Sequence, residues 1–288
     1  MAAASLAFSS PKDGEGSCTG VTDSGMSQQA RADAIRIETL GKTFTTADGA
    51  VAALENLDLT IREGEFVSIV GPSGCGKSTL LMCVAGLIAA SQGSITVNGR
   101  HVSGPVTDLG IVFQEPLLLD WRNVLANVLF QIEMRRLDPK AYESRARDLL
   151  VRVGLGGFES KNPWELSGGM RQRVAICRAL IHDPPLLLMD EPFGALDTLT
   201  RDQMNIDLRR LCAETGKTAL FITHSITEAV FLSDRVVVMA ARPGRIIADL
   251  PVGFAGPRRL SLRTTPEFAE LERQIYAIFR GIGVLRDE

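Results

Sequence analysis

The sequence has no excess of charge of either sign. Its 288 residues include 31 Lys and Arg against 34 Asp and Glu, which gives a formal net charge of -3 at pH 7. A protein that coats nucleic acid normally presents a strongly basic face. The charge balance therefore predicts that nucleic acid is not a partner of this chain.

Long apolar runs are also missing. In the longest stretch without a charged residue, 78–99, the apolar part extends only from Leu80 to Ala90. A membrane-spanning helix needs about 20 consecutive apolar residues. We therefore expect a core helix followed by a strand in this stretch, and no membrane span.

Cysteine is scarce, and its spacing carries no metal-binding pattern. An odd number of cysteines without zinc-binding spacing favours a reducing cytosol over an oxidising compartment. The five cysteines are Cys18, Cys75, Cys83, Cys177 and Cys212.

The remaining composition, 45% hydrophobic and 23% charged, is that of a globular chain. Residues 1–33 begin with a stretch rich in small residues, and we expect a flexible leader there. Its short apolar start has no Lys or Arg before it, so an export signal is not expected.

The main domain is predicted over 34–250, and a short C-terminal extension over 251–288. Within the extension, Thr265 as N-cap and Pro266 as first helical residue predict a docking helix. Its apolar stripe consists of Phe268, Leu271, Ile275 and Ile278.

Runs of strand-forming residues punctuate the main domain. Several of them are continuously apolar, which is typical of strands buried on both faces of a sheet. Between about 116 and 181 the periodicity changes to that of helices, which predicts a helical subdomain inserted into an α/β core. The expected strands are Ile35–Thr39, Leu57–Ile61, Phe66–Val70, Ser94–Val97, Gly110–Phe113, Leu186–Met189, Ala219–Thr223 and Arg235–Met239.

A complete GxxxxGK[ST] motif stands between the expected strand Phe66–Val70 and an expected helix, Ser78–Leu87. Its glycines allow backbone N–H groups to surround phosphate oxygens. Lys77 reaches the β- and γ-phosphates, and Ser78 can ligate Mg²⁺. The alternative, a glycine-rich turn with an exposed lysine, does not explain the strand-loop-helix context. We predict that the nucleotide phosphates bind Gly71, Pro72, Ser73, Gly74, Cys75, Gly76, Lys77, Ser78 and Thr79.

A pair of acids ends the apolar strand that begins at Leu186. The strand delivers Asp190 and Glu191 to the carboxyl edge of a parallel sheet, where ligands of open α/β folds bind. Asp190 suits a second contact to Mg²⁺, and Glu191 suits the polarisation of an attacking water. The alternative, a solvated acid pair, is disfavoured by the phosphate loop upstream.

Further motifs follow in the order found in the ATPase subunits of ABC transporters, and the chain resembles that family from about Ile35 to Leu250. The resemblance implies an α/β fold with a phosphate-loop NTPase core, in which helices cover a RecA-like sheet. It also implies an N-terminal antiparallel β part and the inserted α-helical subdomain. Val112–Pro116 resembles the Q-loop, Leu166–Arg173 the signature motif, Gly194–Asp197 the D-loop and Ile222–His224 the switch histidine.

The resemblance also implies roles for single residues. Phe44 would stack on adenine, although a strand-core residue would fit the sequence as well. Gln114 would contact Mg²⁺ and sense the water, although a surface amide is the alternative. His224 would contact the γ-phosphate, downstream of the catalytic Glu191.

The signature motif implies a second copy of the chain. Ser167, Gly168 and Gly169 open a helix and provide a second anion cradle. In the family, this cradle closes over ATP held by the partner, so we expect a head-to-tail homodimer with composite sites. Asp197 of the D-loop is expected among the nucleotide-binding residues. The commonest fifth residue of the motif is Gln, whereas this chain has Met170, with Gln172 two places later.

The implied function is that of the ATP-hydrolysing subunit of an importer that uses ATP and Mg²⁺. An integral membrane permease would be its direct partner and a periplasmic solute-binding protein an indirect one, at the cytoplasmic face of the inner (plasma) membrane. The run Gln114–Trp121 and the form of the signature look most like importers of nitrate, sulfonate and taurine. Leu117–Trp121 could dock on the permease or fill the core. The alternative function is a soluble ABC ATPase acting on nucleic acid or the ribosome. A phosphate-loop kinase or GTPase is disfavoured, because neither uses the Ser167 cradle or the His224 switch.

Overall fold

A computed structural model describes residues 31–284 except Asp48 and Ala195. The predicted leader falls almost wholly before this range, and so does Cys18. The first strand, β1, begins at Asp33. Of the cysteines in the described part of the chain, Cys75, Cys83, Cys177 and Cys212 are all free and buried.

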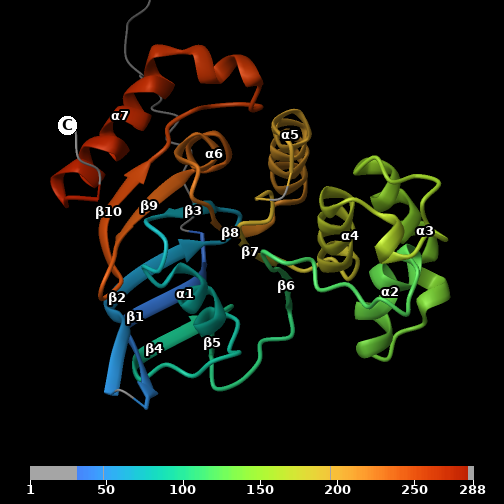
Figure 1. Cartoon of the computed structure of the whole chain (residues 1–288), viewed down its shortest axis with the longest axis horizontal. Coiled ribbons are helices and arrows are strands. Elements are labelled where there is room, and N and C mark those ends of the chain that lie inside the picture. The colour runs from blue at the N-terminus through green and yellow to red at the C-terminus, as the bar shows by residue number, and fades with distance from the viewer. Residues whose placement is uncertain (1–30, 48, 195, 285–288) are drawn as a thin grey trace, which may run out of the picture. The chain divides into compact units, whose positions relative to one another are not determined.

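The central sheet has the strand order β10-β9-β3-β8-β7-β6, and Figure 1 shows the labelled strands in this order. Its neighbouring strands are parallel except for β10, which is antiparallel to β9. Phe66 and Val70 of β3 pack in one apolar cluster, and Val67 and Ile69 pack in another. The alternation places an apolar layer on each face, which explains the continuously apolar strands. The strands are β3 Phe66–Val70, β6 Leu109–Val112, β7 Leu186–Asp190, β8 Thr218–Ile222, β9 Arg235–Ala240 and β10 Arg245–Pro251.

A separate antiparallel sheet has the order β2-β1-β4-β5. β1 and β2 form a hairpin that is much longer than the strands predicted within it. The outer half of β2 is largely exposed, so its sequence has none of the apolar alternation that marks a half-buried strand. The strands are β1 Asp33–Thr46, β2 Gly49–Arg62, β4 Gln92–Val97 and β5 Arg100–His101.

Helices α2, α3 and α4 pack on one another beside β6, the edge strand of the central sheet (Figure 1). Asn123 caps α2 by accepting a hydrogen bond from Ala126 N–H, and Asp138 caps α3 in the same way from Lys140 N–H. These caps satisfy N–H groups that have no partner inside the helix. The elements are α2 Val124–Met134, α3 Pro139–Arg152, the short 3₁₀ helix Pro163–Glu165 and α4 Gly168–Leu180.

The remaining helices are α1, α5, α6 and α7. α1 ends at Val84 and not at Leu87 as predicted, because Gly86 has a φ of +70°. A Cβ there would lie 1.9 Å from the carbonyl oxygen of Gly104, so the chain turns away from the helix at this point. The bounds are α1 Lys77–Val84, α5 Thr198–Thr215, α6 Ile226–Leu232, a 3₁₀ helix Leu260–Thr264 and α7 Pro266–Gly281.

The C-terminal helix α7 begins as the sequence predicts. The hydroxyl of Thr265 accepts a hydrogen bond from Phe268 N–H, and Pro266 is the first helical residue. Phe268, Ile275 and Phe279 are buried, and the helix packs against α6. Among the described residues, no helix combines the length and the apolar character needed to cross a bilayer.

Candidate functional site

The phosphate-loop motif forms the connection between β3 and α1, at the carboxyl edge of the parallel strands. Gly76 has a φ of +92°, and a Cβ at this position would lie 2.6 Å from a methyl group of Leu54 and 2.9 Å from the carbonyl of Ala53. A side chain at Gly76 would therefore be strained and would displace β2. The hairpin of the second sheet thus packs directly on the loop.

Lys77 is buried within the loop. Its Nζ donates hydrogen bonds to the carbonyls of Gly71, at 2.8 Å, and Pro72, at 3.1 Å. The ammonium is held by dipoles on the loop itself, so its charge lies where a nucleotide's phosphates would bind. Burial raises the pKa of the neighbouring Cys75 thiol, and the positive charge of Lys77 opposes this effect.

Ser78 and Asp190 lie together, although they are far apart in the sequence. Asp190 is the last residue of β7 and is buried. Burial raises the pKa of Asp190, and the interaction of its carboxylate with the neighbouring Ser78 side chain opposes this rise. A hydroxyl and a carboxylate are hard oxygen donors of the kind Mg²⁺ prefers. The described residues contain no group of three or more His, Cys, Asp or Glu that could hold a metal alone. The pair therefore fits a Mg²⁺ ion that takes its other ligands from phosphates and water.

Glu191 and His224 are brought into contact by the pairing of β7 with β8. Nδ1 of His224 lies 3.1 Å from Oε2 of Glu191. The backbone of Glu191 has a φ of +44°, which is uncommon for a residue with a side chain. Its N–H donates to the carbonyl of Ile222, which fixes this turn against β8. Both side chains therefore stand at the carboxyl edge of neighbouring parallel strands.

Gln114 is exposed just beyond β6, which pairs with β7. It therefore stands at the same sheet edge as Asp190. Phe44 lies on β1 with 38% of its surface exposed, so the alternative of a buried core residue is wrong. Lys42 Nζ lies 5.0 Å from the centre of the Phe44 ring. The hairpin that carries Phe44 also contributes Leu54 to the contact with Gly76, which leaves an aromatic face exposed on an element that borders the loop.

The signature residues are placed apart from the phosphate loop. Ser167 is the exposed N-cap of α4 and accepts a hydrogen bond of 3.2 Å from Met170 N–H, ahead of Gly168 and Gly169. α4 packs beside β6, whereas the phosphate loop follows β3, and β8 and β7 lie between these strands. Three strand spacings amount to about 14 Å, too far for one phosphate group to contact both elements. Asp197 caps α5 by accepting from Thr200 N–H. The structure thus separates the Ser167 cradle from Lys77 within one chain.

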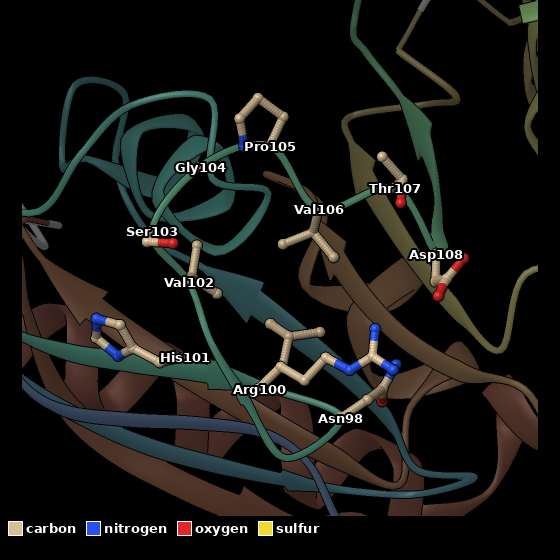
Figure 2. Close-up of a pocket in the computed structure, with 11 residues that line it drawn as sticks. Asn98, Arg100, His101, Val102, Ser103, Gly104, Pro105, Val106, Thr107 and Asp108 are labelled. Atoms are coloured by element: carbon tan, nitrogen blue, oxygen red, sulfur yellow. The ribbon is translucent and has the colours of Figure 1, made fainter. Parts of the chain in front are cut away.

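A cavity of about 390 Å³ adjoins the phosphate loop. Its lining combines the loop with the segment after His224 and, unexpectedly, with Tyr276 and Phe279 of α7 and with Val284. The sequence marked α7 only as an amphipathic helix, and no local motif indicates what its residues border. Another cavity, of about 410 Å³, is lined by the segment from Val97 to Asp108 and contains no predicted site residue (Figure 2).

Apolar side chains are exposed beyond Gln114. Trp121 has 79% of its surface accessible, and Leu117 and Trp164 are also exposed. Leu117 and Trp121 therefore do not fill the core, which was the alternative to a docking surface. Large apolar side chains that stay exposed on a surface are typical of binding faces.

Comparisons with known proteins agree with this geometry. The family model described as ABC transporter matches residues 54–194. The taurine import ATP-binding protein TauB of Escherichia coli K12 is 44% identical over 79% of this chain and 91% of its own length. The TauB of Rhizobium johnstonii is 47% identical over 82% of this chain and 92% of its own. An uncharacterised ABC transporter ATP-binding protein of Methanocaldococcus jannaschii, MJ0412, is 44% identical over 88% of this chain and 92% of its own length. Among solved structures, the ATP-binding cassette MJ0796, a dimer in a post-hydrolysis state bound to ADP and Pi, superposes with a TM-score of 0.70. It is 32% identical and covers 76% of this chain and 100% of its own.

Proposed function

The chain belongs to the ATP-binding subunits of ABC transporters, which are ATPases, and from this membership we propose that it energises an importer. The solute is a small anion or zwitterion of the nitrate, sulfonate or taurine type, and it crosses the membrane through a permease. The similarity to taurine import ATP-binding proteins over about four fifths of the chain supports the solute class. Because the ATPase subunit does not form the solute pocket, this similarity is evidence of descent rather than of pocket chemistry.

The observation that carries ATP hydrolysis is the 3.1 Å contact between Glu191 and His224 at the sheet edge that also holds Lys77 and Asp190. In this proposal Glu191 orients and polarises the attacking water, and His224 holds the γ-phosphate. The contact with His224 holds the Glu191 carboxylate in place. This matters because a general base must be positioned before it can act.

The remaining site residues bind the nucleotide. The loop from Gly71 to Thr79 surrounds the phosphates, with Lys77 as their charged partner, and Phe44 stacks on adenine. Ser78, Asp190 and Gln114 hold Mg²⁺. The ion would neutralise charge on the phosphates when bound.

A second copy of the chain completes each site. The exposed N-terminus of α4, with Ser167, Gly168 and Gly169, provides N–H groups and a hydroxyl that lie too far from Lys77 of the same chain to serve one phosphate. We assign this cradle, with Asp197, to the nucleotide of the partner in a head-to-tail homodimer.

The segment Leu117–Trp121, on which Leu117 and Trp121 are exposed, is the proposed contact with the permease. This contact places the chain at the cytoplasmic face of the inner membrane as a peripheral subunit. A periplasmic solute-binding protein then acts through the permease. No observation favours the nucleic-acid alternative.

Reconstitution tests the proposal. The chain is co-expressed with the permease of a taurine or nitrate importer and placed in proteoliposomes with that importer's solute-binding protein and labelled taurine or nitrate. We expect ATP hydrolysis stimulated by the loaded binding protein and accumulation of the label. The matched Lys77→Ala chain should lose both, because the charged partner of the phosphates is removed. Hydrolysis stimulated by ribosomes or RNA, without association with the permease, would favour the soluble alternative.

A further inference from the structure

A buried glutamate supports the segment that carries His224. Glu228 on α6 is 6% exposed, and its Oε2 accepts a hydrogen bond of 2.6 Å from the hydroxyl of Thr223. The same hydroxyl accepts from Ser225 N–H at 3.0 Å. Thr223 and Ser225 flank His224 in the chain. The conformation of the histidine segment is therefore set by the carboxylate of Glu228.

Arg201, on the first turn of α5, approaches this carboxylate from the other side. Its Nε lies 4.0 Å from Oε1 of Glu228. Both atoms are buried, and within the described part of the chain neither has a hydrogen-bond partner. Removal of Arg201 would therefore leave the buried Glu228 carboxylate without this ion-pair partner.

The guanidinium of Arg201 also holds the turn that follows the catalytic glutamate. Its Nη2 donates a hydrogen bond of 2.9 Å to the carbonyl of Leu196, and the N–H of Gly194 donates to the carbonyl of Glu191. A Cβ on Gly169 would lie 2.6 Å from Cδ2 of Leu196, so this turn also packs on the first turn of α4. The turn thus touches the segments of Glu191 and of the signature motif.

We propose that Arg201 and Glu228 are a positioning pair for ATP hydrolysis. Their ion pair joins the His224 segment to the turn around Leu196, so that the two move as one unit and His224 stays aligned with Glu191. Among the described residues, no hydrogen bond or ion pair joins either side chain to the phosphate loop, and the pair acts on the catalytic step rather than on nucleotide binding. The inference rests on the roles proposed above for Glu191 and His224.

Two charge-removing changes test the pair in the full-length chain: Glu228→Gln is isosteric, and Arg201→Gln also shortens the side chain. Glu228→Gln and Arg201→Gln should each lower kcat about 10-fold or more, since small misplacements of catalytic groups are costly. The affinity for ATP, measured by equilibrium binding with Mg²⁺, should stay within about twofold. Because the two residues act as a unit, the double variant should be no slower than the slower single variant.

A matched control separates positioning from stability. Arg209 lies further along α5 and pairs with Asp234, beyond α6, at 2.6 Å. Arg209→Gln should lower Tm without lowering kcat. If Glu228→Gln does not fold, Arg201→Gln provides the test, because the Arg201 side chain is less buried than that of Glu228. A kcat loss no larger than that of Arg209→Gln, or a loss confined to ATP affinity, would overturn the inference.

The wild type and Glu191→Gln distinguish this failure from failure of the proposed function. The positioning role alone is overturned if the wild type hydrolyses ATP, Glu191→Gln does not, and the variants of Arg201 and Glu228 hydrolyse ATP as fast as the wild type. Absence of hydrolysis by the wild type, or full hydrolysis by Glu191→Gln, overturns the proposed catalytic roles and the inference together.

Discussion

Nε2 of Gln172 donates a hydrogen bond of 2.9 Å to the carbonyl of Phe113, the residue before Gln114. Gln172 is 1% exposed on α4, and α4 packs beside β6. The helix that begins with the signature motif is therefore fastened to the strand end that leads into Gln114. In the sequence, Gln172 was notable only because Met170 occupies the usual place of a glutamine.

Replacement of Gln172 tests this link. Gln172→Leu keeps a similar volume but leaves the half-buried carbonyl of Phe113 without this donor. We expect the free energy of unfolding, measured in urea, to fall by about 1–3 kcal/mol. The control Gln203→Ala removes an exposed amide that bonds to Asp207, and should change stability by less than about 0.5 kcal/mol. Equal effects of the two substitutions would show that the buried bond contributes little.

Glu191→Gln should separate ATP binding from hydrolysis. The amide keeps the shape of the side chain but cannot act as a base, so hydrolysis should fall by about 10²–10⁴-fold. ATP binding is spared, and ATP should then hold two copies together as a dimer visible by light scattering. A variant that hydrolyses slowly yet stays monomeric at saturating ATP and Mg²⁺ would contradict the composite site.

Mixed dimers test directly whether Ser167 serves the partner's nucleotide. Lys77→Ala disables the phosphate loop, and Ser167→Arg places a long side chain in the anion cradle. If the two changes are on different chains, both defects fall in one composite site and the other site is native. If both are on one chain, each composite site contains one defect.

The readout is the number of ATP molecules occluded per dimer. We expect one in the split arrangement and none in the doubled arrangement. A site built within one chain reverses this ranking, because the wild-type partner of the doubled chain would be intact. One occluded ATP in the doubled arrangement and none in the split one would therefore exclude the trans geometry.

His182 should make stability depend on pH below neutrality. Burial, followed by the nearby Arg135 cation, lowers the pKa of His182 to about 4. Between about pH 6.5, the ordinary pKa of histidine, and pH 4, the unfolded chain binds a proton that the folded chain does not. Stability from this group is therefore fully present above about pH 6.5 and is lost as the pH falls toward 4.

Urea unfolding of wild type and His182→Leu at pH 7.5 and pH 5 measures this effect. The drop in unfolding free energy between the two pH values should be smaller in His182→Leu. Equal drops would show that other groups account for the acid sensitivity. His101→Leu, which removes an exposed histidine, is measured alongside as the control.

The chemistry of the site follows from the sequence, because its signals are local. A phosphate loop requires glycines and a lysine at fixed spacing, and the strand before Asp190 is continuously apolar because both faces of the sheet are covered. Those constraints act within eight or ten neighbouring residues and can be recognised without the fold. For the same reason the cap at Thr265 was predicted correctly from residue type.

Other features depended on contacts between distant parts of the chain. β10 escaped prediction because, as an antiparallel edge strand with Asp249 and Pro251, it lacks the apolar run of a central strand. The exposure of Trp121 and the contact between Arg201 and Glu228 have no local signature either. An apolar side chain is suited to a core and to a docking surface alike, so the sequence does not distinguish them. The ion pair between Arg201 and Glu228 forms only because α5 and α6 pack together in the fold. The sequence by itself determined which residues are proposed to bind phosphate and to polarise water; the tertiary structure decided which of them meet, because long-range packing sets those distances.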